Sequence, residues 1–285
     1  MQQWFALGIL ALKVSIPMQV FATGLGATWD DASYLFRRPR LLLHSILARN
    51  VAVPILAILL IKAFPFHVAV AITLGVLAVT PVPPLLPKSQ IKAGARSSYV
   101  LGLLVSQSLL AVALVPVTIE LMNLALGTRA HFSPVRVAML IGKTILIPLG
   151  AGMLASAFLT KLRGIAPLIL TLGTVLLIFG AIPLLLLGWK DFGVLAGNGA
   201  ILAIAIFIIV GTAAGHLLGG PRPEDRLALA VATPARHPGL AVAIAQANYP
   251  EQGRLVAGAI VIYLVLRILL WLPYARWQHS HRNEV

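Results

Sequence analysis

Long apolar runs constrain this chain more than any other feature of its sequence. A helix needs about 20 mainly apolar residues to cross a bilayer, and nine runs reach that length, near residues 4–27, 41–63, 66–93, 99–123, 134–158, 165–189, 195–219, 225–248 and 253–276. Only 11% of the 285 residues are charged, whereas a soluble domain carries about 25%. We therefore predict an all-α integral membrane protein with nine transmembrane elements in a single polytopic domain, residues 1–285.

Basic residues in the short gaps between these runs predict the orientation in the membrane. The chain has 22 Lys and Arg against 8 Asp and Glu, and most of the basic ones, among them Arg37, Arg96 and Arg276, fall in gaps on one face. Because cytoplasmic loops are enriched in Lys and Arg, we place the N-terminus outside and the C-terminus in the cytoplasm, in the plasma (inner) membrane. No basic patch is interleaved with aromatic residues, so we expect no nucleic-acid partner.

The chain carries no sequence signal of a catalytic or metal centre. It has no cysteine, which excludes disulfides, thiol nucleophiles and Cys-ligated metals. Its acidic residues lie mostly in loops, and it has no His, Asp and Glu cluster at metal-ligand spacing, no GxSxG elbow and no phosphate loop. We therefore expect no enzyme, and no cofactor apart from a sodium ion, which is considered below.

Prolines interrupt two of the apolar runs. The run near 66–93 contains Pro81, Pro83, Pro84 and Pro87, and the run near 225–248 contains Pro234, Pro238 and Gly239. A proline inside a helix removes a backbone donor and clashes with the preceding turn, at a cost of about 3 kcal/mol. We predict that both helices stop and restart at these residues; a pair of packing kinks is the alternative.

The two breaks resemble one another. Ala78-Val79-Thr80-Pro81 parallels Val231-Ala232-Thr233-Pro234, and the broken runs are the third and the eighth, so they cross the membrane in opposite directions. The pattern predicts an inverted repeat with halves near 4–123 and 134–276, in which two discontinuous helices cross. Unwound backbone survives in a membrane only where protein or a water-filled cavity covers it, and opposed half-helix ends suit a charged solute or ion. This arrangement is typical of a secondary transporter.

Polar side chains at and after the breaks are the predicted binding residues. They are Thr80, Lys88, Gln90, Thr233, Arg236, His237, Gln246 and Asn248. Arg236 lies at membrane depth, where an ionisable residue is expensive and usually functional. It either contacts an anionic solute or holds exposed carbonyls of the crossing peptide, and the two roles are compatible. His237 either titrates near neutral pH and couples protons, or stays neutral and hydrogen-bonded.

The residues at both breaks also carry a resemblance to a known family. The stretches 233–241 (TPARHPGLA) and 80–84 (TPVPP), together with 21–25 (FATGL) followed by an Arg-Arg-Pro loop, resemble the bile acid:sodium symporter family over residues of about 15–275. The resemblance implies a core domain of two crossing broken helices, a panel domain, and alternating access by movement of one domain against the other.

The chain departs from this family where the family binds sodium. The family's sodium sites use a glutamate, a glutamine and an asparagine at the second break, and Ala232, Arg236 and His237 stand at those positions here. Sodium favours hard oxygen ligands and negative charge, as other hard cations do. A fixed arginine would repel it in a poorly screened cavity. The resemblance therefore implies the fold, and we do not extend it to sodium coupling.

Three functional hypotheses follow. The first is a carrier of a small organic anion, in which Arg236 and Lys88 stand where sodium would bind, driven by protons or by the solute gradient. The second is a sodium-coupled carrier of an organic anion whose ion ligands are backbone carbonyls and the hydroxyls of Thr80 and Thr233. The third is a channel or receptor on the same fold. The predicted partners are the organic anion and the lipid bilayer, with no prediction of oligomeric state.

Overall fold

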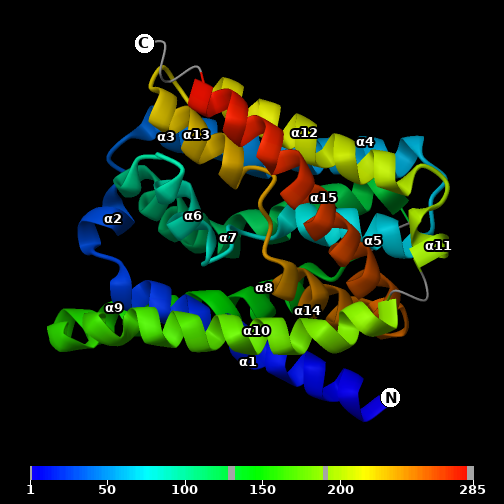
Figure 1. Ribbon diagram of the computed structural model, residues 1–285, viewed down its shortest axis with the longest axis horizontal. Helices are drawn as coiled ribbons and strands as arrows, with labels where there is room; N and C mark the ends of the chain where they lie inside the picture. Colours follow the sequence, from blue (N-terminus) through cyan, green and yellow to red (C-terminus); the bar gives the residue numbers. More distant parts are fainter. Residues whose placement is uncertain (1, 128–131, 189–191, 281–285) are drawn as a thin grey trace.

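The described part of the chain is helical throughout. The computed structural model describes residues 2–127, 132–188 and 192–280, and every regular element within them is a helix (Figure 1). The longest uninterrupted helices are α1 (Gln2–Gly26), α7 (Ser97–Leu126), α10 (Ala166–Gly188), α12 (Ala200–Leu218) and α15 (Gly253–Ser280). Shorter helices are α2 (Trp29–Ser33) and α11 (Phe192–Ala196), with 3-10 turns at Thr160–Ile165 and Pro250–Gln252.

Two long helices are each divided by a π-helical turn. The first comprises α3 (Pro39–Ile46), the turn Leu47–Ala52 and α4 (Val53–Ala63), and the second comprises α8 (Pro134–Ile141), the turn Gly142–Leu146 and α9 (Ile147–Phe158). Pro54 and Pro148 stand at the second position of the helix that follows each turn. Because proline has no N–H and its ring clashes with the carbonyl four residues earlier, the helix widens there into a π turn.

Six helices in the described ranges are long and apolar enough to cross a membrane. They are Pro39–Ala63, Ser97–Leu126, Pro134–Phe158, Thr160–Ile182, Ala200–Leu218 and Pro250–Gln278, while the apolar stretches Leu10–Gly26 and Val68–Val79 are shorter. Large apolar side chains such as Leu124, Phe158 and Leu217 are exposed on the outside, as a lipid-facing surface requires. The prediction of an all-α membrane protein is confirmed; the number of nine elements and the inverted repeat stay predictions.

Helices α1, α9 and α10 pack together as one layer along a side of the molecule (Figure 1). Glycines allow the close approach: a Cβ on Gly24 would overlap the carbonyl oxygen of Leu149, and a Cβ on Gly152 would overlap that of Phe21. Small residues at helix contacts are how membrane helices pack without a hydrophobic driving force. The side chain of Gln19 adds a buried hydrogen bond from α1 to the carbonyl of Gly173 in α10, at 3.0 Å.

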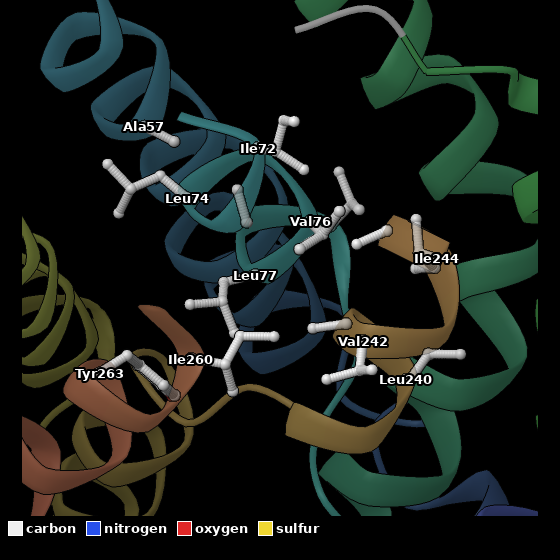
Figure 2. Close-up of a cluster of buried hydrophobic side chains, with 14 of the residues drawn as sticks. Ala57, Ile72, Leu74, Val76, Leu77, Leu240, Val242, Ile244, Ile260 and Tyr263 are labelled. Atoms are coloured by element: carbon white, nitrogen blue, oxygen red, sulfur yellow. The ribbon is translucent and has the colours of Figure 1, made fainter. Parts of the chain in front are cut away.

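The hydrophobic core gathers around α5 (Val68–Val79), in which every residue from Ala69 to Val79 is buried. A helix that is apolar on all sides belongs inside the molecule. Figure 2 shows Leu77 of α5 beside Ile260 of α15, and Val76 of α5 on the side of Val242 and Ile244 of α14 (Pro238–Asn248), and these residues belong to one buried cluster. The core therefore lies where the first half of one broken element meets the second half of the other.

Both predicted interruptions are confirmed. The first element ends as α5 at Val79 and restarts as α6 (Leu86–Lys92), and the second ends as α13 (Pro223–Ala232) and restarts as α14. The chain is not helical between the halves, which excludes the alternative of simple packing kinks. Helix α5 packs against α14, and α6 packs against α13. The two breaks thus meet in the interior.

Candidate functional site

The first break leaves carbonyl groups without helical partners. The last carbonyls of any helix lack an intrahelical donor, and here prolines also remove the donors that continued chain would supply. Pro83 and Pro84 stand three and four residues after Thr80, and Pro81 stands three residues after Ala78. The carbonyls of Ala78 and Thr80 therefore need a donor from elsewhere in the fold.

The guanidinium of Arg236 supplies that donor. Its Nη1 donates to the carbonyl oxygens of Ala78 and Thr80, each at 3.1 Å, and its Nη2 donates to the carbonyl oxygen of Arg49 at 3.0 Å. Arg49 lies in the π turn, and the residue five positions later is Pro54, which has no N–H for a π-helical bond. Arg236, only 1% exposed, thus joins three carbonyls that prolines help to leave free.

Tyr263 of α15 holds the second break in place. Its hydroxyl donates to the carbonyl oxygen of Pro234 at 2.6 Å and accepts from the backbone N–H of Arg236 at 3.0 Å. The ring is fully buried and packs edge-on against Phe207 of α12. One side chain therefore satisfies two backbone groups of the unwound segment and sets the position from which Arg236 reaches the first break.

The electrostatics of the crossing favour a cation. Helix α5 ends at Val79, beside the carbonyls that Arg236 binds, and α13 ends at Ala232, a few residues before Arg236. A helix C-terminus carries a partial negative charge of about half an elementary charge. In transporters with broken helices, such C-terminal ends and unwound carbonyls are the groups that coordinate sodium or protons. Here a guanidinium from the protein itself occupies that environment.

Four other predicted site residues are buried at or next to the breaks: Thr80, Gln90, Thr233 and His237. The hydroxyls of Thr80 and Thr233 donate to the carbonyls of Leu77 and Leu229 in their own helices, at 3.1 and 2.7 Å. The Nδ1 atom of His237 accepts from the N–H of Leu240 at 3.2 Å and caps α14. Its Nε2 atom is buried and has no partner among the described residues.

Gln90 joins the two broken elements at their other halves. Its Nε2 donates to the carbonyl oxygen of Ala228 in α13 at 2.7 Å. Nearby, the side chain of Arg96 contacts the buried carboxylate of Asp225 at 3.3 Å. Gln90 and Arg96 thus connect α6 and the start of α7 to α13. Together with the packing of α5 against α14, the two broken elements contact each other on either side of the crossing.

The remaining predicted residues lie elsewhere. Gln246 and Asn248 stand at the far end of α14, about two turns beyond the break. Asn248 accepts a hydrogen bond from the N–H of Ser133 at 2.9 Å and donates to the carbonyl oxygen of Ile244, so it connects α14 to the start of α8. Lys88 lies in α6, but its side chain is outside the part of the structure that is described.

The prolines and the glycine of the breaks occupy the predicted positions. Pro81, Pro83 and Pro84 lie between α5 and α6, and Pro234 lies between α13 and α14. Pro87 is the second residue of α6, and Pro238 is the first residue of α14. Gly239 faces the layer of α1, α9 and α10, because a Cβ there would lie 3.2 Å from Ile16 and 3.3 Å from Leu177. This glycine therefore sets how closely α14 approaches that layer.

Arg49, Tyr263 and Arg267 are absent from the predicted site. Arg49 lies within the predicted span 41–63 and Arg267 within the predicted span 253–276. An ionisable residue inside a span is itself a signal of function, so their position could have identified both. Tyr263 gives no such signal, since a tyrosine is common in apolar helices and its two partners are backbone atoms of a distant segment.

A cavity of about 210 Å³ adjoins the crossing. It lies between α6, α12, α13 and α15, and its lining includes the apolar residues Leu86, Ile208 and Val231, the break residue Pro234, and the polar residues Ser89, Thr212 and Arg267. A second cavity, of about 480 Å³, shares Ile208, Thr212, Leu270 and Tyr274 with the first. The space beside the breaks is therefore mainly apolar, with an arginine in its wall.

Comparison with known proteins agrees with the resemblance seen in the sequence. Residues 14–192 match the model of the Sodium Bile acid symporter family, whereas a comparison with curated proteins gave no match. The matched range contains Arg49 and the first break and ends before the second break, so the segment around Arg236 lies outside it. The match spans more than half of the chain, and we conclude that this chain belongs to the sodium bile acid symporter family.

Proposed function

We propose that this chain is a secondary carrier that moves a small organic anion by alternating access and does not couple that movement to sodium. The observation that carries the proposal is the set of three hydrogen bonds from Arg236 to the carbonyl oxygens of Ala78, Thr80 and Arg49. These oxygens are hard ligands of the kind that sodium takes. Because the guanidinium already binds them, it stands in place of the coupling ion.

The positive charge of Arg236 disfavours sodium at the crossing, in addition to the occupation of the carbonyl oxygens that sodium would need. Two like charges about 4 Å apart repel by about 4 kcal/mol at an effective dielectric constant of about 20. A sodium ion at the crossing would lie within such a distance of the guanidinium. Binding would therefore be weakened by roughly three orders of magnitude, since about 1.4 kcal/mol corresponds to a factor of ten.

The lining of the cavity beside the crossing supports an anionic solute. The wall of the 210 Å³ cavity contains Arg267, and its other lining residues are mainly apolar. An apolar pocket with few polar groups fits a small organic molecule, and the arginine selects a carboxylate or related oxyanion. The solute gradient or protons would drive transport, with His237 as the buried titratable group at the second break.

The proposal includes a topology for the movement. Nine membrane elements form an inverted repeat, with the N-terminus outside and the C-terminus in the cytoplasm of a plasma (inner) membrane. The layer of α1, α9 and α10 is the panel, and the helices around the two breaks are the core. Movement of the panel against the core opens the crossing to either side. The absence of a side chain at Gly239, where a Cβ would lie 3.2 Å from Ile16 and 3.3 Å from Leu177, supports a sliding surface there.

Transport by purified protein in liposomes tests the proposal. A panel of monocarboxylates is first screened for thermal stabilisation, and uptake of the best one is then measured under separately imposed sodium and proton gradients. We expect saturable counterflow and a flux that is unchanged when sodium is replaced by choline. A flux that rises with the sodium gradient and ignores pH would show instead a sodium-coupled symporter, and flux without counterflow would show a channel.

A further inference from the structure

Arg49 has a buried guanidinium that no described residue contacts by a hydrogen bond. Its side chain is among the largest that are fully buried, at 1% exposure. None of its three guanidinium nitrogens has a hydrogen-bond partner within the described residues. Only its backbone carbonyl takes part in the crossing, as an acceptor from Arg236. The side chain therefore has a role that the contacts at the crossing do not explain.

The surroundings of Arg49 make its isolation more costly. The charged and polar groups with the largest electrostatic effect on it are Arg236, Tyr263, Arg267 and Tyr99, and none of these four is a carboxylate. The buried carboxylate of Asp225 is instead taken by Arg96. An unpaired buried charge is unfavourable, and two neighbouring arginines add repulsion. This cluster of three arginines, of which Arg49 and Arg236 are buried, favours an anion that the described residues do not supply.

The cavity beside the crossing offers space for a ligand next to Arg267, one of these three arginines. Arg267 belongs to the cluster and also lines the cavity. The lining residues Ile208 and Thr212 come from α12, which packs against the π turn that carries Arg49. Arg236 contributes little to ligand binding, because both of its terminal nitrogens already donate to carbonyls. Of the described side chains in this cluster, Arg49 and Arg267 therefore remain as cations for a ligand.

We propose that Arg49, together with Arg267, binds the carboxylate of the transported solute, whose apolar body lies in the cavity between α6, α12, α13 and α15. This inference rests on the proposed function and names the residue that recognises the anion. A guanidinium presents a rigid fork of donors that matches a carboxylate in a bidentate pair. The apolar walls favour a monocarboxylate with a compact apolar body over an inorganic anion or a polycarboxylate.

Ligand-dependent thermal unfolding of the detergent-purified full chain tests the inference. The probes are benzoate, cyclohexanecarboxylate and 1-naphthoate, with benzyl alcohol as the uncharged counterpart of benzoate and with chloride and inorganic phosphate as simple anions. The variants are Arg49→Gln and, as a matched control, Arg40→Gln, since Arg40 is exposed in α3 of the same divided helix.

We expect at least one of the three carboxylates to stabilise the wild type and Arg40→Gln equally and saturably. Its apparent affinity for Arg49→Gln should fall by about tenfold to about a hundredfold, the factor for one charge-assisted pair. Without ligand, Arg49→Gln should unfold at the same temperature as the wild type or higher, because an unpaired charge is removed.

Four results would overturn the assignment. The first is equal stabilisation of Arg49→Gln and the wild type by a carboxylate, and the second is no stabilisation of the wild type by any of the three carboxylates. The third is a lower unfolding temperature of ligand-free Arg49→Gln than of the ligand-free wild type. The fourth is stabilisation of the wild type by chloride or phosphate that equals its stabilisation by the carboxylates. The third would indicate a structural arginine and the fourth an inorganic counter-ion. None of them concerns sodium, so the sodium-independence of flux is tested separately and can stand or fail alone.

Discussion

Replacement of Arg236 by glutamine should remove the hydrogen bonds that join the two breaks and make the stability of the protein depend on sodium. Arg236→Gln removes the guanidinium that donates to the carbonyl oxygens of Ala78, Thr80 and Arg49. A glutamine amide is shorter and can replace at most part of these bonds. The carbonyls are buried at the end of α5 and in the π turn, so water does not readily replace the lost donor.

The size of the effect follows from the bonds and from the charge. Three hydrogen bonds to a charged donor contribute about 1.5–3 kcal/mol each, or about 4.5–9 kcal/mol in all. Burial of the guanidinium costs several kcal/mol and offsets part of this sum. We therefore expect the free energy of unfolding of the variant to be lower than that of the wild type by about 3 kcal/mol. This difference lowers Tm by about 6–12 °C, at about 2–4 °C per kcal/mol.

Sodium should then restore part of the loss. The vacated carbonyl oxygens and the negative helix ends form a cation site once the guanidinium is gone. Thermal unfolding of detergent-purified protein in sodium chloride and in choline chloride at equal ionic strength measures this, with Arg40→Gln as the control at an exposed arginine. Sodium should raise the Tm of Arg236→Gln and leave that of the wild type unchanged. A wild type that sodium stabilises, or a variant that loses no stability, would refute the reasoning.

Two further substitutions test the packing that positions the site. Tyr263→Phe removes the hydroxyl that serves the carbonyl of Pro234 and the N–H of Arg236, and two buried backbone groups left unpaired should cost about 2–4 kcal/mol; an unchanged Tm would show that this hydroxyl is dispensable. Gly152→Ala places a Cβ against the carbonyl oxygen of Phe21, and the overpacking should cost about 1–3 kcal/mol and slow counterflow, with Gly26→Ala, where a Cβ meets nothing, as the matched control.

The predicted spans agree closely with the helices because the bilayer imposes a local requirement. An apolar run of about 20 residues is needed wherever a helix crosses. The divided helix of α8 and α9 begins at residue 134 and ends at residue 158, as predicted. The breaks were equally predictable, since a proline acts on its own backbone and on the turn before it. The π turns at Leu47–Ala52 and Gly142–Leu146 have the same cause, yet a single proline kinks a helix in several ways, so the sequence alone did not predict them.

The role of individual side chains depended on which face of each helix turns inward. Helices α12 and α15 carry apolar residues on all of their faces, so their sequences carry little information on which face is buried. Gln246 and Asn248 were predicted as site residues from their element, but they lie at its far end. The position of Arg49 inside a span marks it as unusual, but only the fold shows that it is buried and has no hydrogen-bond partner among the described residues.

The sequence by itself determined that this chain is a helical membrane protein, that two of its helices break, and that an arginine stands in the second break. These features follow from apolar length and proline chemistry, which act over a few residues. The tertiary structure alone decided what Arg236 does there, because its partners lie 156 to 187 residues away along the chain. Prolines free carbonyls in two separate elements, and only the packing of those elements brings one guanidinium within reach of all three.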